Sequence, residues 1–219
     1  GRFRVDRMEV EDCGEIQATL RISSRYGQSF ADQFITIYRY TPDIDCFFRV
    51  NWQESYTMLK LAFDTYIKKG ETWCDTAYGS QRRNTEGWEE PGQMWTDLTG
   101  EIDGKPYGFA MINDSKYGFD VRDGSIRQTL LRCPAYAYHD RARHNASEPW
   151  PIMDQGWHRF QMRIVPHSGN WRDADIARKA WEMNEPVFAH VESAHPGDLP
   201  GMCSLAGTDT PGIAITILK

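Results

Sequence analysis

Glycine, arginine and tryptophan residues gather in the segment 65–98, where the alternation of apolar residues weakens. Arg82 and Arg83 carry planar guanidinium groups that can hold a carboxylate or sugar hydroxyls. Trp88 or Trp95 can stack on the flat apolar face of a pyranose. A long irregular segment inside a compact domain is more often functional than accidental. The alternative is a solvated loop whose tryptophans anchor it to the core.

Two histidines and an aspartate, His139, Asp140 and His144, raise the question of a metal site. A His-x₄-His pair binds a metal ion well from a helix. Pro149 and Pro151 follow closely and argue against a continuing helix. We therefore expect a surface loop here, and no metal ion bound by this chain.

Charge and composition exclude two classes of partner. The formal net charge is −6, the pI is about 5.5, and no cluster of Lys and Arg forms a basic stripe. Nucleic acid is therefore not expected as a partner. The apolar runs are far too short to span a bilayer, and no secretion signal opens the sequence. A membrane is not expected either.

Cysteine usage points to a reducing compartment. The five cysteines are odd in number and widely scattered, and no Cys-x-x-Cys pair occurs. We expect free, mostly buried thiols in a cytoplasmic protein rather than a disulfide framework.

The elements that position these side chains are expected to be strands. Alternation of apolar residues over 107–112, 117–122 and 126–131 predicts three strands joined by two tight turns. Asp123-Gly124 is a strong signal for the second turn, because a type I′ hairpin needs positive φ at both central residues. Similar alternation recurs about every ten residues, separated by turn signals. The chain is therefore predicted to be mainly β, a large antiparallel β-sandwich.

One short α-helix is predicted near 171–184. Asn170 can cap it, and Asp173 and Asp175 would lie in its first turns, where the helix dipole favours negative charge. Its apolar stripe is expected to consist of Ala174, Ala177, Ala180 and Trp181.

The two ends of the sequence resemble interrupted strands. Residues 3–10 are expected to face Phe3, Val5 and Met8 inward, and Ile213, Ile215 and Ile217 alternate almost up to the last residue. We therefore expect residues 1–219 to form a single β-sandwich domain, a fragment of a longer chain.

Several consecutive segments resemble one protein family. Residues 113–121, NDSKYGFDV, resemble the N-D-x-K-Y-G-x-D-V segment of family 38 glycoside hydrolases, the retaining α-mannosidases. Residues 130–134 resemble their L-L-R-x-P, and residues 154–160 their D-x-G-x-H-x-F. Residues 165–171 are similar to P-H-x-G-x-W, and residues 184–186 to N-x-P. The order and spacing make the match specific over nearly the whole chain, with the bacterial and cytosolic-type branch as the best fit.

The resemblance implies a layout in which this chain is not the catalytic part. In the family, an N-terminal α/β barrel carries the zinc ion, the aspartate nucleophile and the acid/base carboxylate. A retaining glycosidase needs such a carboxyl pair, and zinc can template the sugar hydroxyls. This chain resembles the later β-sandwich of the galactose-mutarotase-like type. We therefore expect no catalytic residue and no metal ligand here, with zinc in the full-length enzyme.

The sandwich of such enzymes packs on the barrel and lends loops to the rim of the sugar site. The resemblance implies as partners its own N-terminal catalytic barrel, mannose-containing glycans and other copies in a homo-oligomer. For each rim residue the alternative is a turn or an interdomain contact. The rim candidates are Tyr78, Arg82, Arg83, Asn84, Asp114, Lys116, Asp154 and Gln155.

The expected function is thus the non-catalytic β-sandwich portion of an α-mannosidase, inactive by itself. A first alternative is a stand-alone carbohydrate-binding module. A second is a mutarotase-like sugar epimerase, which would use a His/Glu acid–base pair. His158 and His167 are its histidine candidates, and no sequence signal pairs either with a glutamate.

Overall fold

The computed structural model describes residues 1–67, 70–136, 145, 147–185, 187–198, 200–210, 213 and 215. The chain divides into two units, Gly1–Pro186 and Val187–Lys219. In the second unit the described residues form neither helix nor strand. The strand expected there is therefore absent at Ile213 and Ile215, while Ile217 lies outside the described residues.

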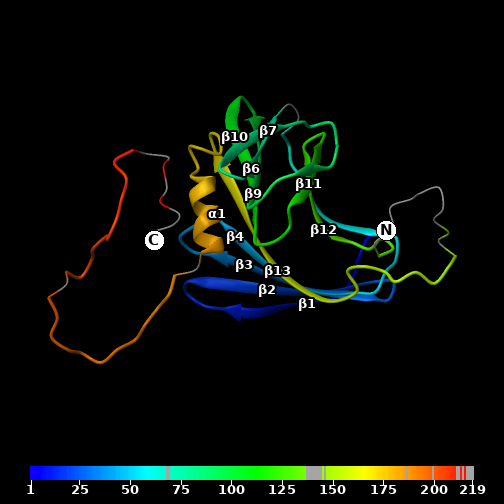
Figure 1. Ribbon diagram of the computed structural model, residues 1–219, viewed down its shortest axis with the longest axis horizontal. Coiled ribbons are helices and arrows are strands. Elements are labelled where there is room, and N and C mark those ends of the chain that lie inside the picture. The colour runs from blue at the N-terminus through cyan, green and yellow to red at the C-terminus, as the bar shows by residue number, and fades with distance from the viewer. Residues whose placement is uncertain are drawn as a thin grey trace. The chain divides into compact units, whose positions relative to one another are not determined.

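The first unit is built of strands with one described helix, as Figure 1 shows. The elements are β1 Arg4–Cys13, β2 Gln17–Tyr26, β3 Ser29–Tyr38, β4 Ile44–Trp52, β5 Met58–Asp64, β6 Glu71–Thr76, β7 Gly79–Arg83, β8 Glu90–Pro91, β9 Trp95–Ile102, β10 Lys105–Asn113, β11 Gly118–Arg122, β12 Ser125–Arg132, β13 Gly156–Ser168 and α1 Ile176–Asn184.

Two antiparallel sheets make up the unit. The larger has nine strands in the order β1-β2-β3-β4-β13-β10-β9-β6-β7, and the smaller has four in the order β5-β12-β11-β8. Phe48 on β4 and Phe160 on β13 stack at 5.0 Å on the inner face of the large sheet. They belong to one buried cluster with Phe119 and Ile126 of the small sheet. The predicted mainly β, antiparallel sandwich is confirmed.

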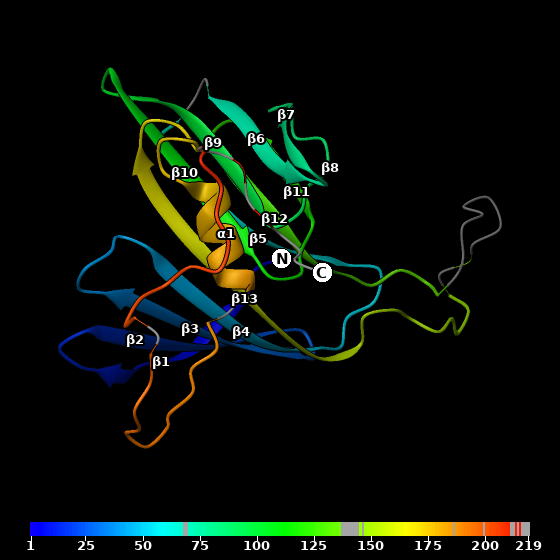
Figure 2. The ribbon, with the colours of Figure 1, turned by 60° about the vertical axis from the view of Figure 1, so that its left-hand side comes forward.

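The outer face of the large sheet carries a second apolar cluster. Ala110 and Ile112 of β10 and Val165 of β13 pack there against Ile176 and Ala180 of α1. Figure 2 shows the helix against this face. Since β10 also places Met111 in the inner cluster, this strand is covered on both faces.

The predicted three-strand meander is wrong at its first turn. β10 pairs with β9 and β13 in the large sheet, whereas β11 pairs with β12 and β8 in the small one. Residues 114–117 therefore carry the chain from one sheet to the other, and we call them the crossing. The second turn is confirmed: Asp123 and Gly124 have φ of 51° and 79°.

The irregular segment expected over 65–98 is also wrong. It contains a hairpin, β6–β7, and the strand β9. Thr72 and Cys74 alternate into the core with no exposed surface. The alternation of β6 is not visible as a hydrophobic pattern in the sequence, because its inward-facing residues are small or polar and its outward-facing residues include Trp73.

The helix begins five residues later than expected. Asn170 Oδ1 accepts from the backbone N–H groups of Arg172 at 2.8 Å and Asp173 at 3.3 Å, so it caps a separate turn. Asp175 then has φ 53°, a left-handed conformation that no α-helix continues through. α1 therefore starts at Ile176, and Asp173 and Asp175 are not in its first turn. Of the expected stripe, Ala180 is buried but Trp181 is 40% exposed.

The inner face of the large sheet extends beyond the buried core. In the register from β1 to β4, Met8 continues the row that contains Phe48, and Val10 continues the row that contains Cys46. Met8 and Val10 are nevertheless 58% and 67% exposed, and Val5 is exposed too. The expectation that residues 3–10 turn Val5 and Met8 inward to a core is therefore wrong.

Three of the five thiols are buried: Cys46, Cys74 and Cys133. Burial raises the pKa of the Cys46 thiol to about 12, and burial also raises the pKa of Cys74. The thiolate is the reacting form, so both thiols should be inert at ordinary pH.

We expect a thiol-specific chromogenic reagent at about pH 8 to modify only Cys13 and Cys203 quickly in the native chain. All five cysteines should react once denaturant is added. Rapid modification of a third thiol without denaturant would contradict the burial described here.

Candidate functional site

Four of the predicted rim residues, Asp114, Lys116, Asp154 and Gln155, lie at the crossing and at the turn before β13; we call them the rim group. The carboxylates of Asp154 and Asp114 both act electrostatically on Lys116. Burial nevertheless lowers the pKa of Lys116, because its half-buried ammonium has lost part of its hydration. Its Nζ lies 5.0 Å from the centre of the Phe160 ring. The structure thus brings one cation and two anions together at the place where the sheets join.

The rim group is held by backbone contacts. Asp114 Oδ2 accepts from the N–H of Gln161 at 3.0 Å, and Asp154 Oδ2 accepts from the N–H of Arg132 at 3.1 Å. Gln155 Nε2 donates to the carbonyl of Glu54 at 2.7 Å. These bonds fix the side chains of Asp114, Asp154 and Gln155 around the Lys116 ammonium.

Asn113 and Gln128 shape the crossing, and sequence reasoning missed Gln128 as a residue of this site. Asn113 is fully buried, and its Oδ1 accepts from the N–H groups of Ser115 at 3.1 Å and Lys116 at 2.7 Å. The Asn113 side chain therefore bonds the backbone of the crossing itself. Gln128 Nε2 donates to the carbonyls of Lys116 and, at 2.8 Å, Gly118.

The other four rim candidates, Tyr78, Arg82, Arg83 and Asn84, belong to the β6–β7 hairpin and the residue after it. Tyr78 lies in the turn with φ 67° and a fully exposed side chain. Arg82 pairs with Glu71 at 3.1 Å.

Arg83 Nη2 donates to the carbonyl of Pro91 at 3.0 Å, and the Asn84 amide donates to Glu90. Their side chains therefore tie the hairpin to β8. Because Pro91 pairs with Gly118 of β11, Arg83 and Asn84 also support the end of the crossing.

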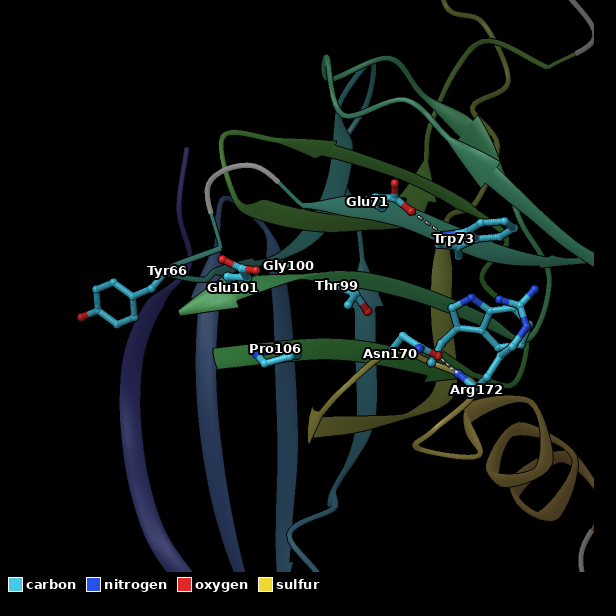
Figure 3. Close-up of a pocket in the computed structure, with 10 residues that line it drawn as sticks. Tyr66, Glu71, Trp73, Thr99, Gly100, Glu101, Pro106, Asn170 and Arg172 are labelled. Carbon is cyan, nitrogen blue, oxygen red and sulfur yellow. Dashed lines mark hydrogen bonds between the residues drawn. The ribbon is translucent and has the colours of Figure 1, made fainter. Parts of the chain in front are cut away.

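A pocket of about 730 Å³ opens on the outer face of the large sheet, away from the inner core. Figure 3 shows Glu71 and Trp73 of β6 above it, Thr99 and Glu101 of β9 along it, and Arg172 at its far end. Sequence reasoning missed this pocket, because Trp73 and Trp171 are far apart in the chain.

An aspartate–histidine pair lies beneath the pocket. His167 Nε2 and Asp97 Oδ1 are 2.7 Å apart, with 6% and 0% of their side chains exposed. Thr99, which lines the pocket, donates its hydroxyl to the other oxygen of Asp97. His158 Nε2 instead lies 3.0 Å from the carbonyl of Asp154. A carboxylate closed to solvent does not reach a sugar, so this pair does not present the acid and base of an epimerase.

The described residues contain no group of three or more His, Cys, Asp and Glu side chains that would hold a metal ion. His139, Asp140 and His144 lie outside the described residues.

Within the described ranges, no helix has the length and apolar character to cross a membrane.

The chain is similar in sequence to one protein family and to several known proteins. Residues 3–144 match the model of the glycosyl hydrolases family 38 C-terminal domain. The chain is 26% identical over 144 residues to human alpha-mannosidase 2C1, and 29% identical over 170 residues to alpha-mannosidase G of Dictyostelium discoideum. These matches cover 64% and 74% of this chain but only 13% and 14% of the two relatives.

The crystal structure of an alpha-mannosidase from Enterococcus faecalis V583 has the same fold, with a TM-score of 0.72 at 14% sequence identity. The match covers 90% of this chain and 26% of that one.

Proposed function

The chain belongs to the C-terminal domain family of the family 38 glycosyl hydrolases, and we propose that it is the non-catalytic β-sandwich of a retaining α-mannosidase. The match over residues 3–144 carries this proposal, and the relatives that bear the name alpha-mannosidase support it. The chain spans a small share of those relatives. We therefore place the hydrolytic carboxylates and the zinc ion on a catalytic barrel outside residues 1–219.

In this proposal residues 1–219 are one domain that packs on that barrel, and the rim group lies at the edge of its sugar site. Lys116 supports this role best. Its ammonium is half-buried and stripped of part of its water, with the carboxylates of Asp114 and Asp154 nearby. A cation positioned in this way donates strongly to sugar hydroxyls. The same rim has four further candidates, Tyr78, Arg82, Arg83 and Asn84. The side chains of Arg83 and Asn84 already form hydrogen bonds with β8.

The proposal extends to the setting of the enzyme. We propose a cytoplasmic location, which agrees with the buried thiols, and mannose-containing glycans as substrates. Contacts between copies in a homo-oligomer are a further proposed role.

The longer polypeptide that contains this chain provides the test. It should hydrolyse an aryl α-mannoside, and residues 1–219 alone should not. In that polypeptide Lys116→Ala should lower kcat/KM by about 10- to 100-fold, the value of a hydrogen bond to a charged group.

Lys105→Ala, at an exposed position where β10 begins, is the matched control and should leave kcat/KM unchanged. Unchanged kcat/KM for Lys116→Ala would remove Lys116 from the sugar site. Turnover by residues 1–219 alone would overturn the non-catalytic assignment.

A further inference from the structure

The pocket on the outer face of the large sheet has an aromatic end. The rings of Trp73 and Trp171 lie 6.0 Å apart at 44°, and Trp171 packs on Trp95 at 4.9 Å. The Arg172 guanidinium carbon lies 4.1 Å from the Trp171 ring centre and 5.4 Å from that of Trp73. Because Trp95 is buried in the cluster under α1, the aromatic end is anchored to the fold.

Polar groups of both kinds line the remainder of the pocket. Arg172 and Asn170 offer donors, while Glu71 and Glu101 offer carboxylate acceptors. Among the described residues neither Glu101 nor the Arg172 guanidinium has an ion-pair partner. Figure 3 shows these groups spread along the pocket between Glu101 and Arg172. Hydrogen-bonding capacity therefore remains at both ends.

Two further observations point to an occupant. The Trp171 Nε1 donor is buried and has no hydrogen-bond partner in the described structure, which is unusual in a folded protein. Glu71 is already oriented, since it accepts from Trp73 Nε1 at 3.3 Å and pairs with Arg82 at 3.1 Å. The volume of about 730 Å³ falls within the range of about 300–1,000 Å³ that is typical of small-molecule sites.

The charge pattern selects the class of ligand. An anion would meet Glu71 and Glu101, and a cation would meet Arg172. A neutral molecule with many hydroxyl groups can donate to the carboxylates and accept from the guanidinium and the Asn170 amide. Its apolar ring face can lie against an indole.

We propose that this pocket binds one or two pyranose units of a neutral glycan, with Trp73 as the apolar contact and Glu71, Glu101 and Arg172 as hydrogen-bonding groups. The site needs no hydrolytic group. It stands on the pocket alone, so its failure would leave the proposed mannosidase function untouched.

Titration of the chain with methyl α-mannoside and with α-1,2-mannobiose tests the proposal. Saturable binding is expected by tryptophan fluorescence and by saturation-transfer NMR. Trp73→Ala should weaken it at least about tenfold, because the ring contact is lost. Trp73→Phe should recover part of the affinity.

Glu101→Ala is a second binding-site variant that should leave the fold intact, since the Glu101 side chain is exposed and has no ion-pair partner among the described residues. It should weaken binding about three- to tenfold. Trp157→Ala, at a 62% exposed indole that does not line the pocket, is the matched control and should bind as the unmodified chain does.

The proposal is overturned if neither sugar shows saturable binding, or if Trp73→Ala and Glu101→Ala bind unchanged. Equal or tighter binding of glucuronate would contradict the assignment to neutral glycans.

Discussion

Replacing His167 with alanine should destabilise the chain by about 1–3 kcal/mol, the cost of leaving a buried carboxyl group without its hydrogen-bond partner. Asp97 has no exposed surface, and His167 Nε2 lies 2.7 Å from its Oδ1. Among the described residues, the hydroxyl of Thr99 is the other side chain that donates to this carboxylate. Urea unfolding followed by tryptophan fluorescence measures the loss of free energy.

A second variant perturbs the same pair from β10, the strand between the strands that carry Asp97 and His167. A Cβ added at Gly108 would lie 2.0 Å from His167 Cε1, so Gly108→Ala must displace the imidazole. We expect Gly108→Ala to destabilise the chain in the same direction, and Gly108→Ala combined with His167→Ala to cost less than the sum of the two. His190→Ala, at a histidine that is exposed in the second unit, is the control and should change nothing. A loss below about 1 kcal/mol for His167→Ala would show that the pair does not stabilise the fold.

Replacing Gln128 with leucine should loosen the crossing and destabilise the chain by at least about 2 kcal/mol. The side chain is 1% exposed, and its Nε2 is shared by the carbonyls of Lys116 and Gly118. Leucine has a similar size but donates nothing, so both carbonyls lose a partner at about 1–3 kcal/mol each. The buried Oε1 of Gln128 has no partner in the described structure, and its removal returns part of this cost.

Hydrogen exchange separates this effect from a general loss of stability. In Gln128→Leu the amides of residues 114–118 should exchange faster than those of β13, because the bonds lost are at the crossing. Gln81→Leu, at an exposed position on β7, is the matched control for the change of residue type. Uniform acceleration over all strands, with no excess at 114–118, would refute the positioning role of Gln128.

The sheets were predictable wherever apolar side chains alternate with polar ones. β4, β12 and β13 show this pattern, and Asp123-Gly124 correctly predicts the hairpin turn between β11 and β12. The pattern failed at β6, where Thr72 and Cys74 are the inward residues and sequence hydrophobicity does not mark them. It also gave no sign that β10 and β11 enter different sheets, because alternation within a strand says nothing about which strand is its neighbour.

Some features of the candidate site follow from local sequence, and others depend on how distant segments pack together. The bonds from Asn113 to the N–H groups of Ser115 and Lys116 follow from local sequence, but the passage of residues 114–117 from one sheet to the other does not. Lys116 and Asp154 come together only through the pairing of β13 with β10 and β4. The pocket forms only where Trp73 and Trp171, which are distant in the sequence, lie close together in the fold. Trp171 and Arg172 are positioned by the turn that Asn170 caps. The late start of α1 depends on the backbone of Asp175, which no propensity scale shows.

The unequal size of the two sheets affects how stability depends on temperature. Met8 and Val10 are 58% and 67% exposed, while Phe48 and Cys46, which lie in the same rows of the large sheet on β4, are buried. The heat capacity increment of unfolding follows the apolar area that leaves the interior. A sandwich whose second layer stops short therefore has a smaller increment per residue than a closed one of equal length. Its curve of free energy against temperature is correspondingly flatter.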